Sequence, residues 1–186
     1  MKLVVAMTGA SGAIYTQCLL DNLDAGQHEI HFISTKHARE VAQIELPKGE
    51  VKLDARVIRY DERDSMFVPF VSGSAKFGAM VVIPASMGTI GRVANGFSDS
   101  TVARAADVFL KERRKLIFVP REAPYNLIHL RNMATLTEAG ATIIPASPAF
   151  YNKPQTIMDL VDTVVARVLD HLDIEHKLVK RWQSAE

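Results

Sequence analysis

Five short apolar segments set the limits on how this chain can fold. They are rich in Val and Ile and do not alternate between apolar and polar residues, which is typical of central parallel strands covered on both faces. A further, less apolar strand is expected at residues 56–60. The five apolar segments are residues 3–7, 30–34, 79–83, 116–119 and 142–144.

Helical patterns lie between these segments, and the last of them carries an apolar stripe from Ile157 to Leu172. Gly26 and Gly140 stand near expected helix ends, where glycine commonly stops a helix. The alternation predicts a doubly wound α/β fold of the flavodoxin or Rossmann type, with three layers and a mostly parallel sheet. We expect a single domain over residues 1–186, with a polar tail from about residue 173 that has one apolar anchor, Trp182. The helices are expected at residues 14–23, 36–44, 86–94, 101–113, 127–139 and 155–172.

The composition excludes several classes of function. The chain has 186 residues, of which 48% are hydrophobic and 23% charged, and a formal net charge of +1. A nearly neutral chain without a basic stretch gives no footprint for nucleic acid or an anionic membrane. No apolar run is long enough to cross a bilayer, and the N-terminal run is too short for a signal peptide, so we expect a cytoplasmic protein. Small molecules and other proteins remain as partners.

Neither a disulfide nor a metal site is expected. Cys18 is the single cysteine and falls on the apolar side of the first helix, where a small buried hydrophobe is the simplest interpretation. The six histidines contain no HExxH pair and no cluster with Asp or Glu at ligand spacing. We therefore expect no structural metal.

Polar residues follow most of the expected strands. In a doubly wound sheet, ligands bind beyond the carboxyl ends of the strands, where the strand order reverses. The first loop has two glycines around Ser11 and leads into a helix, so its free N–H groups and the helix dipole would suit a phosphate. The alternative for Ser11, and for Ser86 in a later loop, is a helix N-cap. The five loops are residues 8–11, 34–35, 84–89, 120–124 and 145–151.

The first loop fits a mononucleotide better than a dinucleotide. Its glycines follow the pattern GxxG and not GxGxxG, and the acid that would hold a ribose after the next strand is replaced by Ser34-Thr35-Lys36. The hydroxyls of Ser11, Thr35, Ser86 and Thr89 can bind phosphate and ribityl oxygens without that acid.

Two long stretches fit the strand and helix pattern less well. Residues 45–54 have mixed charge, and residues 61–77 contain aromatic residues, among them Phe67 and Phe70, without clear periodicity. Loops of this length in a compact domain are more often functional than idle. We expect a lid or a subunit contact there.

Several motifs together resemble the flavin prenyltransferases of the UbiX family, over nearly the whole chain. The segments Arg121-Glu122-Ala123-Pro124 and Leu110-Lys111-Glu112-Arg113-Arg114 are far more specific than the opening glycines. The other matching segments are residues 7–13, 84–89, 104–108, 128–133, 149–151 and 165–167.

This resemblance implies a homo-oligomeric flavodoxin-like subunit, usually in a dodecamer. Such a subunit binds reduced FMN and transfers to it a dimethylallyl group from dimethylallyl phosphate, with new bonds to N5 and C6 of the isoalloxazine. The product, prenylated FMN, is the cofactor of partner decarboxylases of the UbiD type. The monophosphate and the diphosphate both remain open as the prenyl donor.

The resemblance also implies roles for particular residues. Ser11 and Glu122 match the positions that handle the departing phosphate and the protons of ring closure. Family members gather such residues from more than one subunit, which would explain their dispersal here. The matched FMN positions are Gly9, Ala10, Ser11, Thr35, Ser86, Met87, Gly88, Thr89 and Arg121, and those around the prenyl phosphate are Glu45, Lys111, Tyr151 and Arg167.

These residue types suit the chemistry, although simpler interpretations exist. Ionising an allylic phosphate needs cationic and hydrogen-bonding groups on the leaving phosphate, and the allyl cation needs a pocket that excludes water. On the simpler view, Lys111 lies in a solvated charge run, Arg167 lies exposed beside the apolar stripe, and Arg121 with Glu122 forms a local ion pair.

Two features depart from the family. Ser65 stands where some members have an aromatic residue in the loop that covers the prenyl site. Residues 97–101 are also less typical, although we still expect Asp99 or Ser100 to cap the following helix.

Other functions remain open. An FMN-dependent decarboxylase of a cysteine-derived carboxylate has the same fold, but its characteristic histidine and Asn-containing motif are not found here. A decarboxylase subunit of a larger enzyme lacks an obvious site. A non-catalytic FMN carrier would bind FMN without depending on Glu122 or Tyr151.

Overall fold

The chain folds around one six-stranded sheet, with the strand order β3-β2-β1-β4-β5-β6. The computed structural model describes residues 1–62 and 66–180, so Ser65 and Trp182 lie outside the described residues. Every strand pair among the described residues is parallel. The strands are β1 (Lys2–Met7), β2 (Glu29–Ser34), β3 (Ile58–Asp61), β4 (Ala79–Ala85), β5 (Lys115–Pro120) and β6 (Thr142–Ile143).

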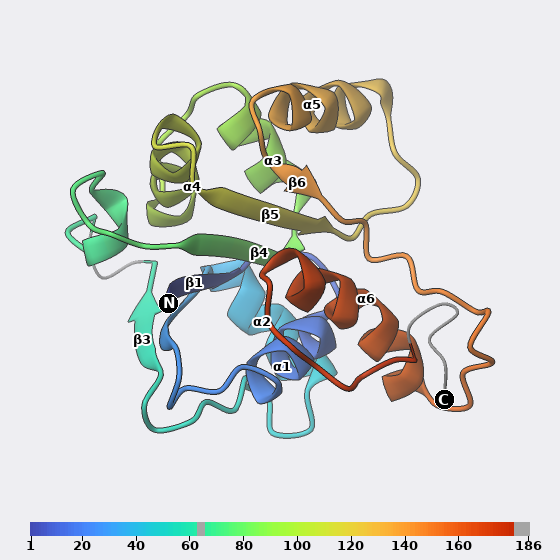
Figure 1. Ribbon diagram of the computed structural model, residues 1–186. Coiled ribbons are helices and arrows are strands. Elements are labelled where there is room, and N and C mark those ends of the chain that lie inside the picture. The colour runs from blue at the N-terminus through green and yellow to red at the C-terminus, as the bar shows by residue number, and fades with distance from the viewer. Residues whose placement is uncertain (63–65, 181–186) are drawn as a thin grey trace.

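Helices cover both faces of the sheet (Figure 1). One face carries α1, α2 and α6, whereas α3, α4, α5 and the short 3-10 helix η1 lie on the other. The chain builds outward from β1 to β3 and then returns to β4 on the other side of β1. The order therefore reverses between β1 and β4, which is where this kind of sheet binds ligands. The helices are α1 (Ala13–Asp21), α2 (Lys36–Glu45), η1 (Pro69–Val71), α3 (Met87–Ala94), α4 (Thr101–Lys111), α5 (Leu127–Glu138) and α6 (Ile157–His171).

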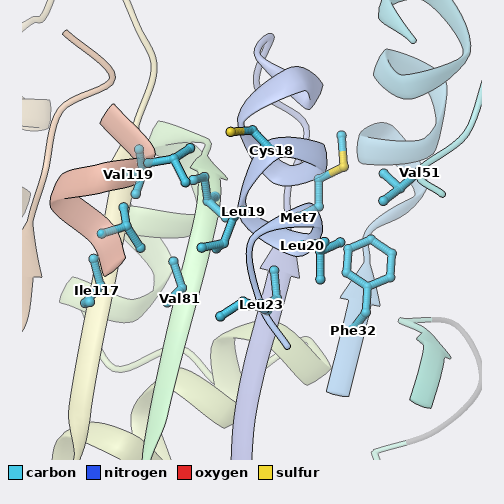
Figure 2. Packing of buried hydrophobic residues seen from close by; sticks show 14 of the residues in the cluster. Met7, Cys18, Leu19, Leu20, Leu23, Phe32, Val51, Val81, Ile117 and Val119 are labelled. Carbon is cyan, nitrogen blue, oxygen red and sulfur yellow. The ribbon is translucent and has the colours of Figure 1, made fainter. Parts of the chain in front are cut away.

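The first helix packs its inner face directly on the sheet. Figure 2 shows Leu19 and Leu20 of α1 facing Val81 of β4 and Phe32 of β2, all within one buried cluster. A fully buried side chain of this size contributes about 2 kcal/mol. Cys18 is buried in the same layer, as expected, and its thiol donates to Oδ1 of Asp162 on α6 at 3.3 Å. Burial, assisted by that carboxylate, raises the pKa of Cys18 to about 12, so the group stays a neutral thiol.

The last helix differs from the prediction at its start. Its apolar stripe is buried from Val161 to Leu172, but Ile157 is 71% exposed. The prediction of a polar tail from residue 173 is also wrong for residues 174–180, because this segment folds back on α6. Its residues Ile174 and Leu178 pack against the core.

The two long stretches contain buried anchors. Leu46 and Val51 are buried in the first, and Phe70 and Phe77 in the second. Phe67, by contrast, is 98% exposed. In the part of the chain that is described, no helix is long and apolar enough to cross a membrane.

Candidate active site

Three helix N-termini converge on one cavity of about 340 Å³ near the point where the strand order reverses. Thr35, Ser86 and Ser100 line it, and each caps the helix that follows. Their hydroxyls accept the N–H groups of Ala38, Thr89 and Ala103 at 3.1, 3.3 and 3.2 Å. The caps expected at Ser86 and Ser100 are confirmed. Because helix N-termini carry partial positive charge, the cavity suits an anion such as a phosphate. Its lining is Thr8, Gly9, Thr35, His37, Glu62, Ser86, Thr89, Arg92, Asp99 and Ser100.

Thr8, which lines this cavity, connects the loops after β1 and β4 through hydrogen bonds. Its hydroxyl donates to the carbonyl of Pro84 at 2.8 Å and accepts the N–H of Ser86 at 2.7 Å. The side chain is 1% exposed, so both of its bonds are shielded from water. The cap residue Ser86 is therefore held in place by a residue of the first loop.

Gly9 allows the first loop to approach α2. A Cβ built on Gly9 would lie 2.5 Å from the Cβ of His37, which is fixed to the first turn of that helix. No larger residue fits unless the loop or the helix moves. The first glycine of the loop is thus needed for close packing of backbone on backbone.

The N-terminus of α1 does not match the expectation for the first loop. The N-cap is Gly12, with no side-chain cap, so the interpretation of Ser11 as N-cap is wrong. The free N–H groups of Gly12 and Ala13 instead donate to Oε2 of Glu45, both at 2.8 Å. The anion at this helix end is therefore the chain's own carboxylate, placed there by the last residue of α2.

Arg121 joins the same cluster from the end of β5. Its Nε donates to the carbonyl of Ser11 at 3.0 Å. Burial alone would raise the pKa of the Glu45 carboxyl, but hydrogen bonds from Ser11, Gly12 and Ala13, together with the Arg121 charge, hold that pKa below its usual value. Ser11, Glu45 and Arg121 thus form one polar cluster, the loop cluster, next to the cavity.

Replacing Glu45 by glutamine is expected to lower the free energy of unfolding by about 1 kcal/mol at pH 7, because the N-terminus of α1 loses its charged acceptor. A carboxyl whose pKa is depressed by folding stabilises the protein above its unfolded pKa and loses this effect as the pH falls through its folded pKa. The difference between variant and wild type should therefore shrink as the pH falls below 4.5. Urea denaturation at pH 7 and at lower pH measures it.

The control for Glu45 is Glu138→Gln, at an exposed glutamate in the last turn of α5. It should change the urea midpoint little at either pH. A Glu45 variant that matches this control at pH 7 would contradict the capping role.

Glu122 follows Arg121 and is exposed at the carboxyl edge of the sheet. Its Oε1 accepts the N–H of Ala123 at 3.0 Å. Among the described residues no ion pair joins it to Arg121, whose Nε donates to the carbonyl of Ser11 instead. The simpler view of Arg121 and Glu122 as a local ion pair is therefore wrong. The carboxylate stays open to a ligand beside the loop cluster.

The other predicted residues lie away from this cluster in a single chain. Lys111 ends α4 and pairs with Glu112 before β5 begins, whereas Arg121 follows the end of β5. A strand of 6 residues separates them, which is about 20 Å. Lys111 is thus at the opposite edge of the sheet from the first loop.

Tyr151 and Arg167 lie near α6. Tyr151 is 62% exposed and lines a second cavity, of about 460 Å³, with residues of α6 and of the segment 178–180. The side chain of Arg167 is 61% exposed and pairs with Asp170 at 2.9 Å. Neither residue lines the cavity at the helix N-termini.

Several residues that line the cavity were not predicted as site residues. Arg92, in the last turn of α3, donates from Nε to Asp99 at 3.3 Å and from Nη1 to the carbonyl of Gly88 at 3.2 Å. His37 and Glu62 also line the cavity. The one sequence signal for this part of the cavity was the expected cap at residues 99–100, because a cap marks a helix N-terminus. Within residues 1–62 and 66–180, no group of three or more His, Cys, Asp or Glu residues could hold a metal ion.

The fold and the polar cavity at the strand ends are those of an α/β flavoprotein, and residues 1–181 match the Flavoprotein family. Flavin prenyltransferase UbiX of Methanocaldococcus jannaschii is 46% identical over 182 residues, which cover 98% of each chain. The chain therefore belongs to the UbiX family of flavin prenyltransferases. The resemblance found in the motifs is confirmed.

Solved structures agree with this membership. A dodecameric FMN-dependent UbiX-like decarboxylase from Escherichia coli O157:H7 superposes with a TM-score of 0.92 and 41% identity, covering 99% of this chain and 100% of that one. AnUbiX (PadA1), in complex with FMN and dimethylallyl pyrophosphate, superposes with a TM-score of 0.90 and 40% identity, covering 100% and 98%. The predicted doubly wound α/β fold is confirmed.

Proposed function

We propose that this protein transfers a dimethylallyl group from dimethylallyl phosphate to reduced FMN. The convergence of the caps of α2, α3 and α4 on one cavity, beside the loop cluster, supports this most directly. It offers an anion site and, next to it, charged groups that can act on a second substrate. The names of the UbiX relatives and the FMN and dimethylallyl pyrophosphate bound to AnUbiX support the same assignment.

The residues of the cavity fit FMN. We propose that the hydroxyls of Thr35, Ser86 and Thr89 and the N–H groups at the start of α3 bind its phosphate and ribityl oxygens. Gly9 and Ala10 would line the flavin side, with Arg121 and Ser11 next to them. The remaining predicted FMN positions, Met87 and Gly88, form the first turn of α3.

The prenyl phosphate needs residues that one chain does not bring together. Lys111 lies across the sheet from the loop cluster, and Tyr151 and Arg167 lie near α6. We therefore propose that the site is completed by neighbouring subunits of a homo-oligomer, and that this is a dodecamer like that of the E. coli relative. Glu45 and Ser11 would then meet these side chains at the subunit boundary.

The chain's groups suit each step of the transfer. The C–O bond of the allylic phosphate breaks, and cationic groups stabilise the phosphate as it leaves with the electron pair. A C–N bond to N5 forms with loss of the N5 proton. Ring closure then adds a proton to the alkene, forms the bond to C6 and releases the C6 proton. We propose that Glu122 takes and gives these protons, and the exposure of its carboxylate beside the loop cluster supports this role.

We propose that the product, prenylated FMN, passes to a decarboxylase of the UbiD type. Reduced FMN is required, so we place the reaction in the reducing cytoplasm.

Release of phosphate tests the proposed function and identifies the donor. The protein is incubated without oxygen with reduced FMN and either dimethylallyl phosphate or dimethylallyl diphosphate. We expect inorganic phosphate to be released from the monophosphate, and only when reduced FMN is present. Release of pyrophosphate from the diphosphate alone would change the donor, and release from neither would contradict the proposal.

A decarboxylase is the second candidate, because the E. coli relative is named an FMN-dependent decarboxylase. It predicts that carbon dioxide is released from an aromatic acid by this chain with FMN alone. We expect no release unless a UbiD-type partner is added. An FMN carrier would bind FMN and show neither activity.

A further inference from the structure

We infer, on the basis of the proposed function in which Arg167 binds the phosphate of the prenyl donor, that His176 is a positioning residue for Arg167 and acts through Asp170. Nη1 of Arg167 donates to Oδ2 of Asp170 at 2.9 Å. Nε2 of His176 lies 3.2 Å from Oδ1 of the same carboxylate. One carboxylate therefore links the imidazole to the guanidinium.

The backbone fixes the orientation of the imidazole. The N–H of Leu178 donates to Nδ1 of His176 at 3.4 Å, so Nδ1 is the acceptor and the proton lies on Nε2, which faces Asp170. The exposed fraction of the side chain rises along the series, from 3% for His176 to 23% for Asp170 and 61% for Arg167. A buried, oriented ring thus holds a carboxylate that in turn holds an exposed guanidinium.

His176 belongs to a segment that also borders Tyr151. Residues 174–180, the C-terminal strap, run back along α6 toward its first turn (Figure 1). Leu178 and Val179 line the cavity of about 460 Å³ together with Tyr151. The same strap therefore adjoins both of the residues near α6 that the proposed function gives to the prenyl phosphate.

Holding Arg167 before the donor arrives favours binding. A free arginine side chain loses much rotamer freedom when it binds a phosphate, and prior fixation reduces that loss. The contact with Asp170 uses Nη1 on one side of the guanidinium, and its five N–H donors leave others for a phosphate. The role of His176 is thus to stop Asp170 from turning away from Arg167.

The test compares donor binding in His176→Ala and in wild type. Dimethylallyl phosphate is titrated calorimetrically into the full-length protein loaded with oxidised FMN, so that no turnover occurs. We expect about tenfold weaker donor binding and unchanged FMN affinity. In an Arg167→Ala background, the second change His176→Ala should alter donor binding less than about twofold, because its effect passes through Arg167.

Controls separate positioning from general destabilisation. His171→Ala, at an exposed histidine in the last turn of α6, should leave donor binding unchanged. Asp170→Asn, which keeps the side-chain volume, should weaken donor binding as His176→Ala does, and it serves if the alanine variant fails to fold. An equal loss from His176→Ala with and without Arg167, or a parallel loss of FMN affinity, would overturn the inference. A wild type that releases no phosphate from the donor would instead contradict the proposed function itself, and the inference with it.

Discussion

Replacing Glu122 by glutamine is expected to leave FMN bound and to slow prenyl transfer by at least about a hundredfold. Glutamine keeps the size of the side chain and can still accept the N–H of Ala123, so the loop after β5 should keep its shape. It has no carboxylate to exchange the protons of N5 alkylation and ring closure. Stopped-flow measurement of the flavin spectrum after mixing with dimethylallyl phosphate gives the rate, and flavin fluorescence titration gives the FMN affinity.

Glu122→Asp is the matched comparison, because it retains an ionisable group on a shorter side chain. Its rate should lie between those of the wild type and the glutamine variant. Loss of FMN from Glu122→Gln would show that Glu122 holds the flavin, and an unchanged rate would remove it from the proton transfers.

Replacing Gly9 by alanine is expected to weaken FMN binding by about a hundredfold. The added Cβ would lie 2.5 Å from the Cβ of His37, and that atom cannot swing away because it is attached to the backbone of α2. Either the first loop or the first turn of α2 must move, and both Thr8 and Thr35 line the cavity there. Flavin fluorescence titration measures the affinity, and urea denaturation should show about 1–3 kcal/mol lost to overpacking.

Gly78→Ala is the control for Gly9, since a Cβ on Gly78 meets nothing closer than 3.6 Å. It lies just before β4, at the amino edge of the sheet. Its FMN affinity should equal that of the wild type. Equal affinities for the two alanine variants would show that the approach of the first loop to α2 does not shape the flavin site.

The strands were predictable because burial on both faces leaves an unbroken apolar run. The helices were predictable where the apolar period is regular, and their caps where a serine or threonine precedes them, as Ser86 and Ser100 do. Helix ends were predicted less accurately. The helix expected to continue to residue 113 ends at Lys111, and Arg113 adopts a left-handed φ of 52°.

The cap of α1 could not be predicted from local sequence. Glu45, which accepts the N–H groups of Gly12 and Ala13, is 33 residues from Gly12 along the chain. Only the packing of α2 beside the first loop brings the two together. The local pattern around Ser11 predicted a phosphate at this helix end, whereas the acceptor found there is a side chain of the protein.

Site residues that lie directly after strands were predictable, and those that lie elsewhere were not. Gly9, Thr35 and Ser86 follow β1, β2 and β4, which are neighbours in the sheet, so the convergence of these residues follows from the topology. His37 and Arg92 lie within helical patterns that say nothing about a ligand. We propose that Lys111 joins the site only in the oligomer, and local patterning does not encode the oligomer.

The mass of the flavin product tests the proposed function most directly. Reduced FMN and dimethylallyl phosphate are incubated with the protein without oxygen, the protein is removed, and the flavin is analysed by mass spectrometry. Transfer replaces one hydrogen by a dimethylallyl group, and ring closure changes no atoms, so the flavin should gain the mass of C5H8 and release one phosphate for each flavin changed. Recovery of FMN at its original mass, with the protein folded and FMN bound, would contradict the assignment of this chain as a flavin prenyltransferase.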